Sequence, residues 1–164
     1  MLISNEWLKD YVNVDQSVQA LAERITRTGI EVDDIIDYTK DIKKLVVGHV
    51  LSKTPHPDAD KLNICQVDLG EEEPVQIVCG APNVDEGQHV IVAKVGGRLP
   101  GGIKIKRAKL RGERSEGMIC SLQEIGISSH VTPKNYESGI YVFPEAVKPG
   151  TDALEALYLS LIHI

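Results

Sequence analysis

Short apolar runs rich in Val, Ile and Leu occur through the middle of the chain, with turns rich in Gly, Pro or acids between them. Runs of this length bounded by turn residues are typical of β-strands. We expect strands at 45–53, 61–69, 75–78, 89–95 and 103–110, with 140–143 closing the sheet. In the run 103–110, Ile103 and Ile105 alternate with Lys104 and Lys106. Five or so short strands predict a small closed barrel.

The first 38 residues show helical spacing instead. Ser4 is a candidate cap for one short helix, and Asp15 for a second that ends before Gly29. Residues 30–38 favour a partly exposed strand, and the whole region is too small to bury a core alone.

At the other end of the chain, Thr151 or Asp152 is expected to cap a last helix.

Length and composition exclude several classes of protein. The 164 residues suit one ordinary domain, or one small domain plus part of another. No apolar run approaches the roughly 20 residues of a membrane span, and the N-terminus does not resemble a signal peptide. Cys65, Cys79 and Cys120 form no CxxC pair, which favours buried thiols in a reducing compartment over a disulfide or zinc site.

The cations are concentrated in residues 94–114. Eight cations there face one acid, Glu113, which gives +7; the other ten cations and twenty-three acids give −13. The natural partner of such a segment is a polyanion, because each neutralised phosphate releases a counterion. A solvated basic hairpin is the alternative that charge alone leaves open. The eight cations are Lys94, Arg98, Lys104, Lys106, Arg107, Lys109, Arg111 and Arg114.

Other candidate chemistry is weak. The stretch His56–Asp60 favours a structural turn over a metal loop, because one histidine and two carboxylates are a poor ligand set. No nucleophile motif is present, so we expect no catalytic residue in this chain. Tyr136, Tyr141 and Phe143 are too few and too late for base stacking, which favours contact with the backbone of a folded RNA.

Four motifs occur in a fixed order: Val47–Val50, Pro55–Leu62, Cys79–Val84 and Ser115–Cys120. Together they resemble the tRNA-binding OB-fold domain of several aminoacyl-tRNA synthetases and of free-standing tRNA-binding proteins. The segments Met1–Val12 and 28–32 are similar to the N-terminus of bacterial phenylalanyl-tRNA synthetase β subunits.

The resemblance implies a mainly β fold, with a five-stranded OB-fold barrel inserted into a small, truncated α/β domain. The expected parts are 1–38 from the α/β domain, 39–151 as the OB domain and 152–159 as the start of the returning α/β domain. Because the family's subunit is several times longer, we expect a fragment, and residues 160–164, which depart from the family, are expected to be a cloning-derived tail.

The resemblance also implies a function and partners. This fragment would bind tRNA and hold no active site, and the cytoplasmic enzyme, an α2β2 tetramer with the α subunit, would join phenylalanine to tRNA using ATP and Mg²⁺. No cofactor, metal or membrane contact is expected for the fragment itself. The implied RNA contacts are the eight cations together with Lys61, Asn83 and Ser115. An architectural module of a synthetase, and a free-standing tRNA-binding protein, are the alternatives.

Overall fold

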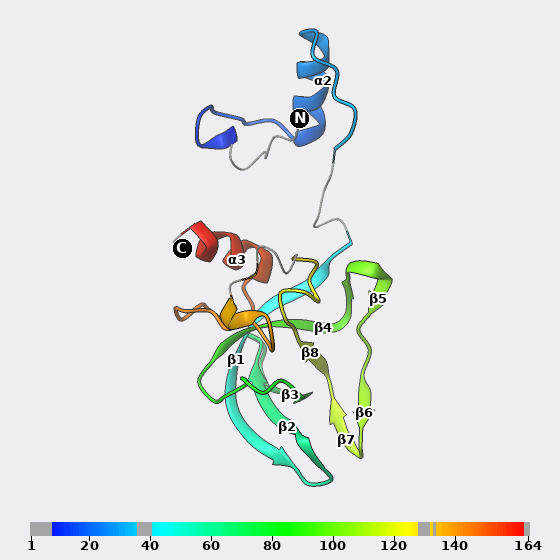
Figure 1. Ribbon diagram of the computed structural model, residues 1–164, viewed down its shortest axis with the longest axis vertical. Coiled ribbons are helices and arrows are strands. Elements are labelled where there is room, and N and C mark those ends of the chain that lie inside the picture. The colour runs from blue at the N-terminus through cyan, green and yellow to red at the C-terminus, as the bar shows by residue number, and fades with distance from the viewer. Residues whose placement is uncertain (1–7, 36–40, 128–131, 133, 163–164) are drawn as a thin grey trace. The chain divides into compact units, whose positions relative to one another are not determined.

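A computed structural model of the chain describes residues 8–35, 41–127, 132 and 134–162, with side chains described as far as residue 157. The chain divides into two compact units, Met1–Tyr38 and Thr39–Ile164 (Figure 1). Each unit is described by itself below.

The first unit contains the helix α2 (Val18–Arg27). Its N-cap is Ser17, whose side chain accepts a hydrogen bond from the Ala20 N–H at 3.3 Å, so the expected cap at Asp15 is two residues too early. Gly29 follows the helix with φ +98°, the left-handed conformation expected of a terminating glycine.

Two other expectations for this unit have different outcomes. The expected strand at 30–38 is wrong over 30–35, which form no strand, and 36–38 lie outside the described residues. The helix expected from Ser4 starts within residues 1–7, which also lie outside the described residues; of its described part, residues 8 and 9 are helical and 10–11 form a turn. No side chain between residues 8 and 35 is buried, which fits the expectation that this region is too small to bury a core alone.

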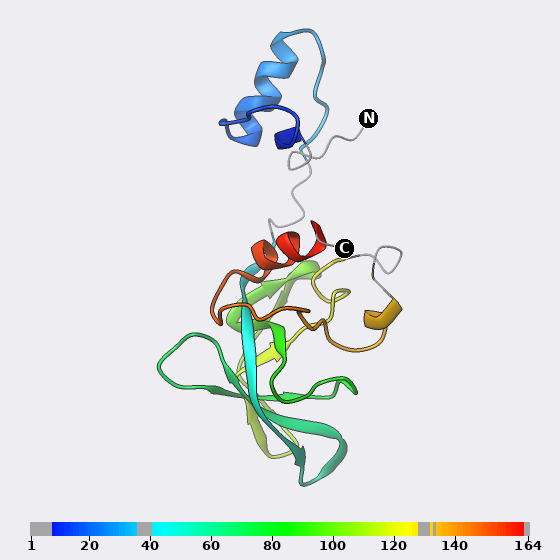
Figure 2. The ribbon, with the colours of Figure 1, turned by 90° about the vertical axis from the view of Figure 1, so that its left-hand side faces the viewer.

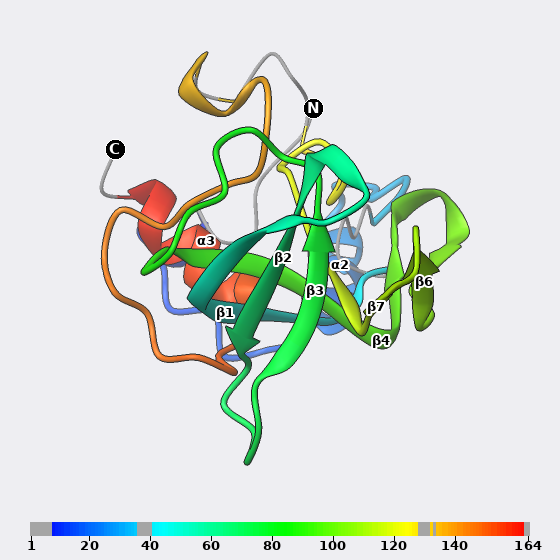
Figure 3. The same ribbon diagram turned by 90° about the horizontal axis from the view of Figure 1, so that it is seen from below.

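The described part of the second unit is mainly β. Its larger antiparallel sheet has the order β3-β2-β1-β4-β5, with β8 also paired to β4, and β6 and β7 form a separate hairpin. Figure 3 shows the larger sheet strongly curled, as in an OB-type half-barrel. The strands are β1 (Lys43–His56), β2 (Ala59–Asp68), β3 (Val75–Cys79), β4 (His89–Leu99), β5 (Ile103–Lys104), β6 (Ala108–Leu110), β7 (Glu113–Ser115) and β8 (Gly117–Ile119).

The first four expected strands are confirmed, but the fifth is wrong as a single strand. The segment 103–110 splits into β5 and β6, because β6 pairs forward with β7 across a tight turn and leaves the edge of β4. Ile105 is buried, whereas Ile103 is 55% exposed, so the two do not share a buried face. The expected strand at 140–143 is reduced to a single bridge between Val90 and Val142.

The curled sheet closes through side-chain and main-chain bonds rather than through a continuous ladder. The Val78 N–H on β3 donates to Ser115 Oγ at 3.1 Å, and the Glu116 N–H donates to the Gln76 carbonyl at 2.8 Å. Inside, β1 approaches its neighbours closely at Gly48, where a Cβ would lie 2.7 Å from methyl groups of Val67 and Val92.

The last helix, α3 (Ala153–Ile162), packs on the barrel (Figure 2). Asp152 caps it, as one of the two expected caps, because its Oδ1 accepts from the N–H groups of Leu154 and Glu155. Ala153 and Leu157 are buried in the same core as β1 and β4. Assignment of this segment to a returning α/β domain, and of 160–164 to a tail, stays a prediction.

One side chain ties the segment before 140 to the barrel. Asn83 Nδ2 donates to the Ile140 carbonyl at 2.8 Å, and its Oδ1 accepts from the Ile140 N–H at 2.9 Å. Ile140 is 3% exposed, so water cannot replace these bonds easily. Gly139 has φ +115° and no room for a Cβ beside the Asn83 amide.

We therefore expect Asn83→Ala to lower the free energy of unfolding by about 2–4 kcal/mol, because two buried main-chain groups lose their partner. Urea denaturation measures the change. Asn135→Ala, at an exposed position, is the matched control and should stay within about 0.5 kcal/mol of the parent. Equal effects of the two substitutions would show that the Asn83 amide does not hold this segment.

The three cysteines are free and buried, as the sequence predicts. Burial raises the pKa of the Cys65 thiol to about 11 and that of Cys120 to about 12, and it also raises the pKa of Cys79. A thiol in the unfolded chain has a pKa of about 8.5, so between that pH and about 11 the unfolded state binds fewer protons. The contribution of these buried thiols to the free energy of unfolding is therefore fully present below about pH 8.5 and is lost as the pH rises from there to about 11.

We expect a disulfide reagent to leave the thiols of the folded chain almost unmodified at about pH 8 and to modify all three in urea. The free energy of unfolding should fall as pH rises from about 9 to 11. Rapid modification of any one thiol in the folded chain at about pH 8 would contradict this assignment.

Candidate nucleic-acid interface

Strand pairing brings three cations into one line. Lys43 on β1 lies opposite Arg98 on β4, and Arg98 lies opposite Lys104 on β5. Cross-strand partners share a face of the sheet, and neighbouring strands are about 4.8 Å apart. All three side chains are exposed. We call this set, Lys43, Arg98 and Lys104, the basic row.

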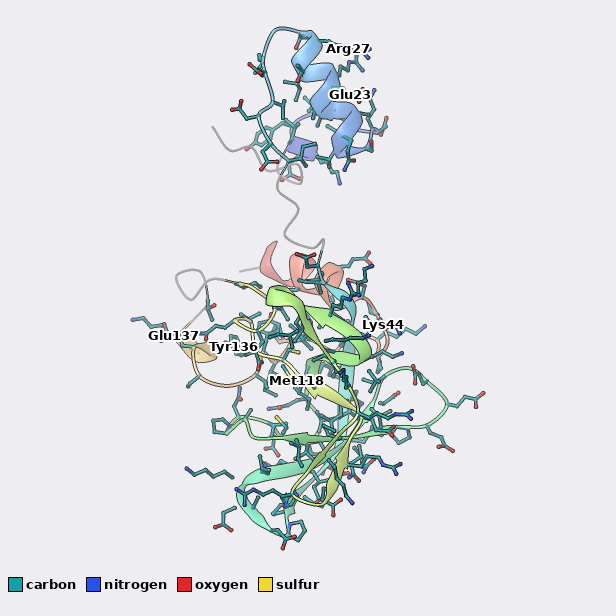
Figure 4. All side chains as sticks on the ribbon, turned by 90° about the vertical axis from the view of Figure 1, so that its right-hand side faces the viewer. Glu23, Arg27, Lys44, Met118, Tyr136 and Glu137 are labelled. Atoms are coloured by element: carbon teal, nitrogen blue, oxygen red, sulfur yellow. The ribbon has the colours of Figure 1, made fainter. Side chains whose placement is uncertain are left out.

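Lys44 extends the positive charge beside the row. Its φ of +57° departs from the strand conformation, and its Nζ lies over Gly96, where a Cβ would come within 3.2 Å of it (Figure 4). Lys43 and Lys44 were not predicted as site residues, because they stand some fifty residues before the basic segment. Only the pairing of β1 with β4 reveals them.

A second set of cations lies on the hairpin formed by β6 and β7. Lys109 lies opposite Arg114, and Arg111 occupies the turn with φ +47°, followed by Gly112 with φ +95°. Two successive positive φ values are typical of the tight turn that joins two antiparallel strands. We call the segment 107–114 the basic hairpin.

Glu116 partly neutralises the basic hairpin. Its Oε1 lies 3.5 Å from Arg107 Nε and 3.9 Å from Arg114 Nη1. Both arginine side chains are more than 70% exposed, so these pairs are weak and leave the guanidinium groups accessible.

The remaining two cations of the segment differ from each other. Lys94 is half-buried on β4 and forms an ion pair with Glu71 of the acidic turn, so its charge is largely balanced within the domain. Lys106 is exposed between β5 and β6. The eight predicted cations are therefore not one uniform face.

His56 fixes the basic hairpin against the β1–β2 turn. Its Nδ1 accepts from the Asp58 N–H at 3.0 Å, so the ring proton is on Nε2, which donates to the Leu110 carbonyl at 3.1 Å. The ring is 4% exposed. This geometry agrees with a structural turn, the favoured interpretation of this motif. On the other side, Gln76 Nε2 donates to the Arg114 carbonyl at 2.9 Å.

The structure gives the three other predicted contacts different surroundings. Lys61 is exposed on β2 and remains a candidate. Ser115 is 3% exposed, and its hydroxyl accepts from the Val78 N–H and donates to the Gly117 carbonyl, so its contact with RNA stays an untested prediction. The Asn83 amide is used by Ile140, and its contact with RNA stays an untested prediction.

The aromatic side chains near residue 140 are not a platform for bases. Tyr141 and Phe143 are almost fully buried, and their rings meet edge to face at 5.1 Å. Tyr136 packs on Tyr141 and donates its hydroxyl to the Val142 carbonyl at 3.1 Å; burial raises the pKa of Tyr136. The arrangement favours contact through cations over stacking.

Two searches over the described residues complete the description of the site. No group of three or more His, Cys, Asp or Glu side chains converges there as metal ligands would. Nor is any described helix both long and apolar enough to span a membrane.

Comparison with known proteins gives close relatives. The β subunit of phenylalanine–tRNA ligase from Staphylococcus epidermidis is 98% identical over 160 residues, and that from Staphylococcus aureus is 84% identical over 160 residues. Both alignments cover 98% of this chain but 20% of the relative, so the chain spans about a fifth of these proteins.

Among solved structures, the MetRS related protein from Pyrococcus horikoshii matches 72% of this chain and 96% of its own, with 22% identity and a TM-score of 0.48. A family model described as a putative tRNA binding domain matches residues 45–152. That match covers more than half of the sequence, and the chain therefore belongs to the putative tRNA binding domain family.

Proposed function

We propose that this chain is a tRNA-binding module of the β subunit of a phenylalanine–tRNA ligase. The observation that carries the proposal is the basic row, three exposed cations aligned across β1, β4 and β5 in a chain of the tRNA-binding family. The 98% identity to a Staphylococcus β subunit supports the assignment to this enzyme.

Binding follows from the chemistry of the row. Arg98 offers a planar fork of donors that fits a phosphate, whereas Lys43 and Lys104 act as point charges on either side. Contacts of this kind fix the position of an RNA without reading its sequence, and they release counterions. The basic hairpin and Lys106 supply further phosphate contacts.

For the whole enzyme we propose the activity that the relatives' name describes, the joining of phenylalanine to its tRNA. ATP and Mg²⁺ would be used at an active site on the α subunit, in a cytoplasmic α2β2 tetramer. This segment would hold tRNA and contribute no catalytic residue.

A second candidate is an architectural role within the synthetase. The observation that favours it is internal neutralisation: Glu71 pairs with Lys94, and Glu116 lies between Arg107 and Arg114. These acids reduce the free positive charge at Lys94 and at the base of the hairpin, and leave the basic row without an acidic partner among the described residues. In that case the row would contact acidic surfaces of neighbouring domains.

We expect the triple variant Lys43→Gln, Arg98→Gln, Lys104→Gln to weaken binding of this chain to bulk tRNA. Each phosphate contact contributes roughly 0.7–0.9 to the slope of log K against log salt, so loss of the row should reduce the slope by roughly 2–3. Fluorescence titration across a salt series measures both quantities.

The matched control removes the same net charge elsewhere, through Arg24→Gln, Arg27→Gln and Lys148→Gln, all at exposed positions. Its slope should equal that of the parent chain. Equal losses of tRNA affinity in the two triple variants would mean that binding depends only on the net charge of the chain. A salt-independent affinity of the parent chain for tRNA would overturn the proposal.

The row variant also separates the two candidate functions in the full-length enzyme. A tRNA contact predicts a higher KM for tRNA with assembly of the subunits unchanged. An architectural contact predicts an unchanged KM for tRNA with weaker assembly.

A further inference from the structure

A pocket of about 420 Å³ lies at the end of the barrel where β3 meets β8. Its volume is within the range of roughly 300–1,000 Å³ that is usual for small-molecule sites. The walls combine apolar side chains with polar groups, and one carboxylate, that of the exposed Glu124, is among them. The lining residues that matter here are Ala81, Pro82, Met118, Glu124 and Ile140.

The walls of the pocket are held in place. Ile140 is fixed by the two hydrogen bonds of Asn83, and Met118 is in β8, which pairs with the central strand β4 (Figure 4). Pro82 follows directly from the turn after β3 and is exposed at the surface. A flat ring entering here would meet Pro82, Met118 and Ile140 without stacking on any aromatic side chain.

The carboxylate of Glu124 is pre-oriented. Its Oε2 accepts from the Ser121 N–H at 2.7 Å and from Ser121 Oγ at 2.9 Å. Within the described residues no partner is found for Oε1, which has room for two more hydrogen bonds. Burial is the main cause of the raised pKa of Cys79 on the pocket wall, and the nearby negative charge of Glu124 raises that pKa further.

An ionised carboxylate accepts hydrogen bonds only, so the ligand must bring N–H or O–H donors, and a phosphate is repelled. Among the four RNA bases, guanine alone presents two adjacent N–H donors, N1 and the 2-amino group, on its pairing edge. Adenine and cytosine place an acceptor nitrogen beside their amino group, and uracil flanks its N–H with two carbonyls. Each of those acceptors would face the carboxylate.

We propose that this pocket binds one unpaired guanine base, with Glu124 accepting hydrogen bonds from its N1–H and 2-amino group. The proposal rests on the proposed tRNA-binding function and adds to it a base-specific site away from the basic row. Lys61 lies at this end of the barrel, because its carbonyl is 3.8 Å from where a Cβ of Gly80, a lining residue, would stand. An exposed cation there suits the phosphate of the bound nucleotide.

The test uses free nucleosides, which carry no phosphate. The chain has two methionines, Met1 and Met118, so labelling of the methionine methyl groups gives one NMR signal at the pocket and one internal control. At about 0.5 M salt, which screens phosphate contacts, guanosine should shift the Met118 signal saturably and leave Met1 unchanged. Inosine, which lacks the 2-amino group, should bind more weakly, and adenosine, cytidine and inorganic phosphate weakest.

Glu124→Gln keeps the size of the side chain and should weaken guanosine binding at least about tenfold, because a charge-assisted acceptor is lost. Glu72→Gln, in the exposed acidic turn, is the matched control and should bind guanosine as the parent chain does.

Equal binding of all nucleosides, or an unchanged affinity in Glu124→Gln, would overturn the proposal. So would stronger binding of ethylguanidinium than of guanosine, which would assign the pocket to an arginine of a protein partner. If the parent chain bound guanosine but showed no binding of tRNA in the salt series, the proposed tRNA-binding function would be contradicted instead. The failure of the guanine site and the failure of the proposed function are therefore distinguishable.

Discussion

The double pairing of β1 is the constraint on which the rest of the second unit depends. This strand pairs with β2 along one edge and with β4 along the other, and one register serves both the core and the surface. This register directs the side chain of Val47 into one buried cluster of the barrel and that of Val50 into the other. The same register places Lys43 opposite Arg98 and so creates the basic row. A slip by one residue would reverse the faces and remove both features.

The row also has an electrostatic cost, which supports an anionic partner. Like charges directly opposite each other on neighbouring strands destabilise a sheet, and here three stand in line. Elsewhere in the barrel the acids compensate: Glu71 is paired with Lys94, and Glu116 lies between two arginines. A phosphate backbone along the row would relieve this repulsion, which no ion pair within the described residues offsets, whereas the pocket at Glu124 offers negative charge and suits a base.

The sequence predicts the local features of this domain well and the non-local ones poorly. Valine-rich runs identify β1 and β4, and the glycine after α2 marks the end of that helix, because both signals lie within a few residues. The break between β5 and β6 depends on which strand each segment pairs with, and alternation carries no such information. For the same reason the charge of residues 94–114 was visible, but the contribution of Lys43 was not. The burial of Ser115 follows from closure of the barrel, which no local pattern encodes.

Protection of individual lysines by tRNA tests the central claim most directly. Brief acetylation of this chain with and without bulk tRNA at low salt, read out by mass spectrometry, reports each side chain separately. The basic row predicts that tRNA protects Lys43 and Lys104, leaves the exposed Lys148 reactive, and loses its effect at high salt. Equal protection of all three lysines, or protection of Lys148 alone, would contradict the assignment of tRNA binding to the row.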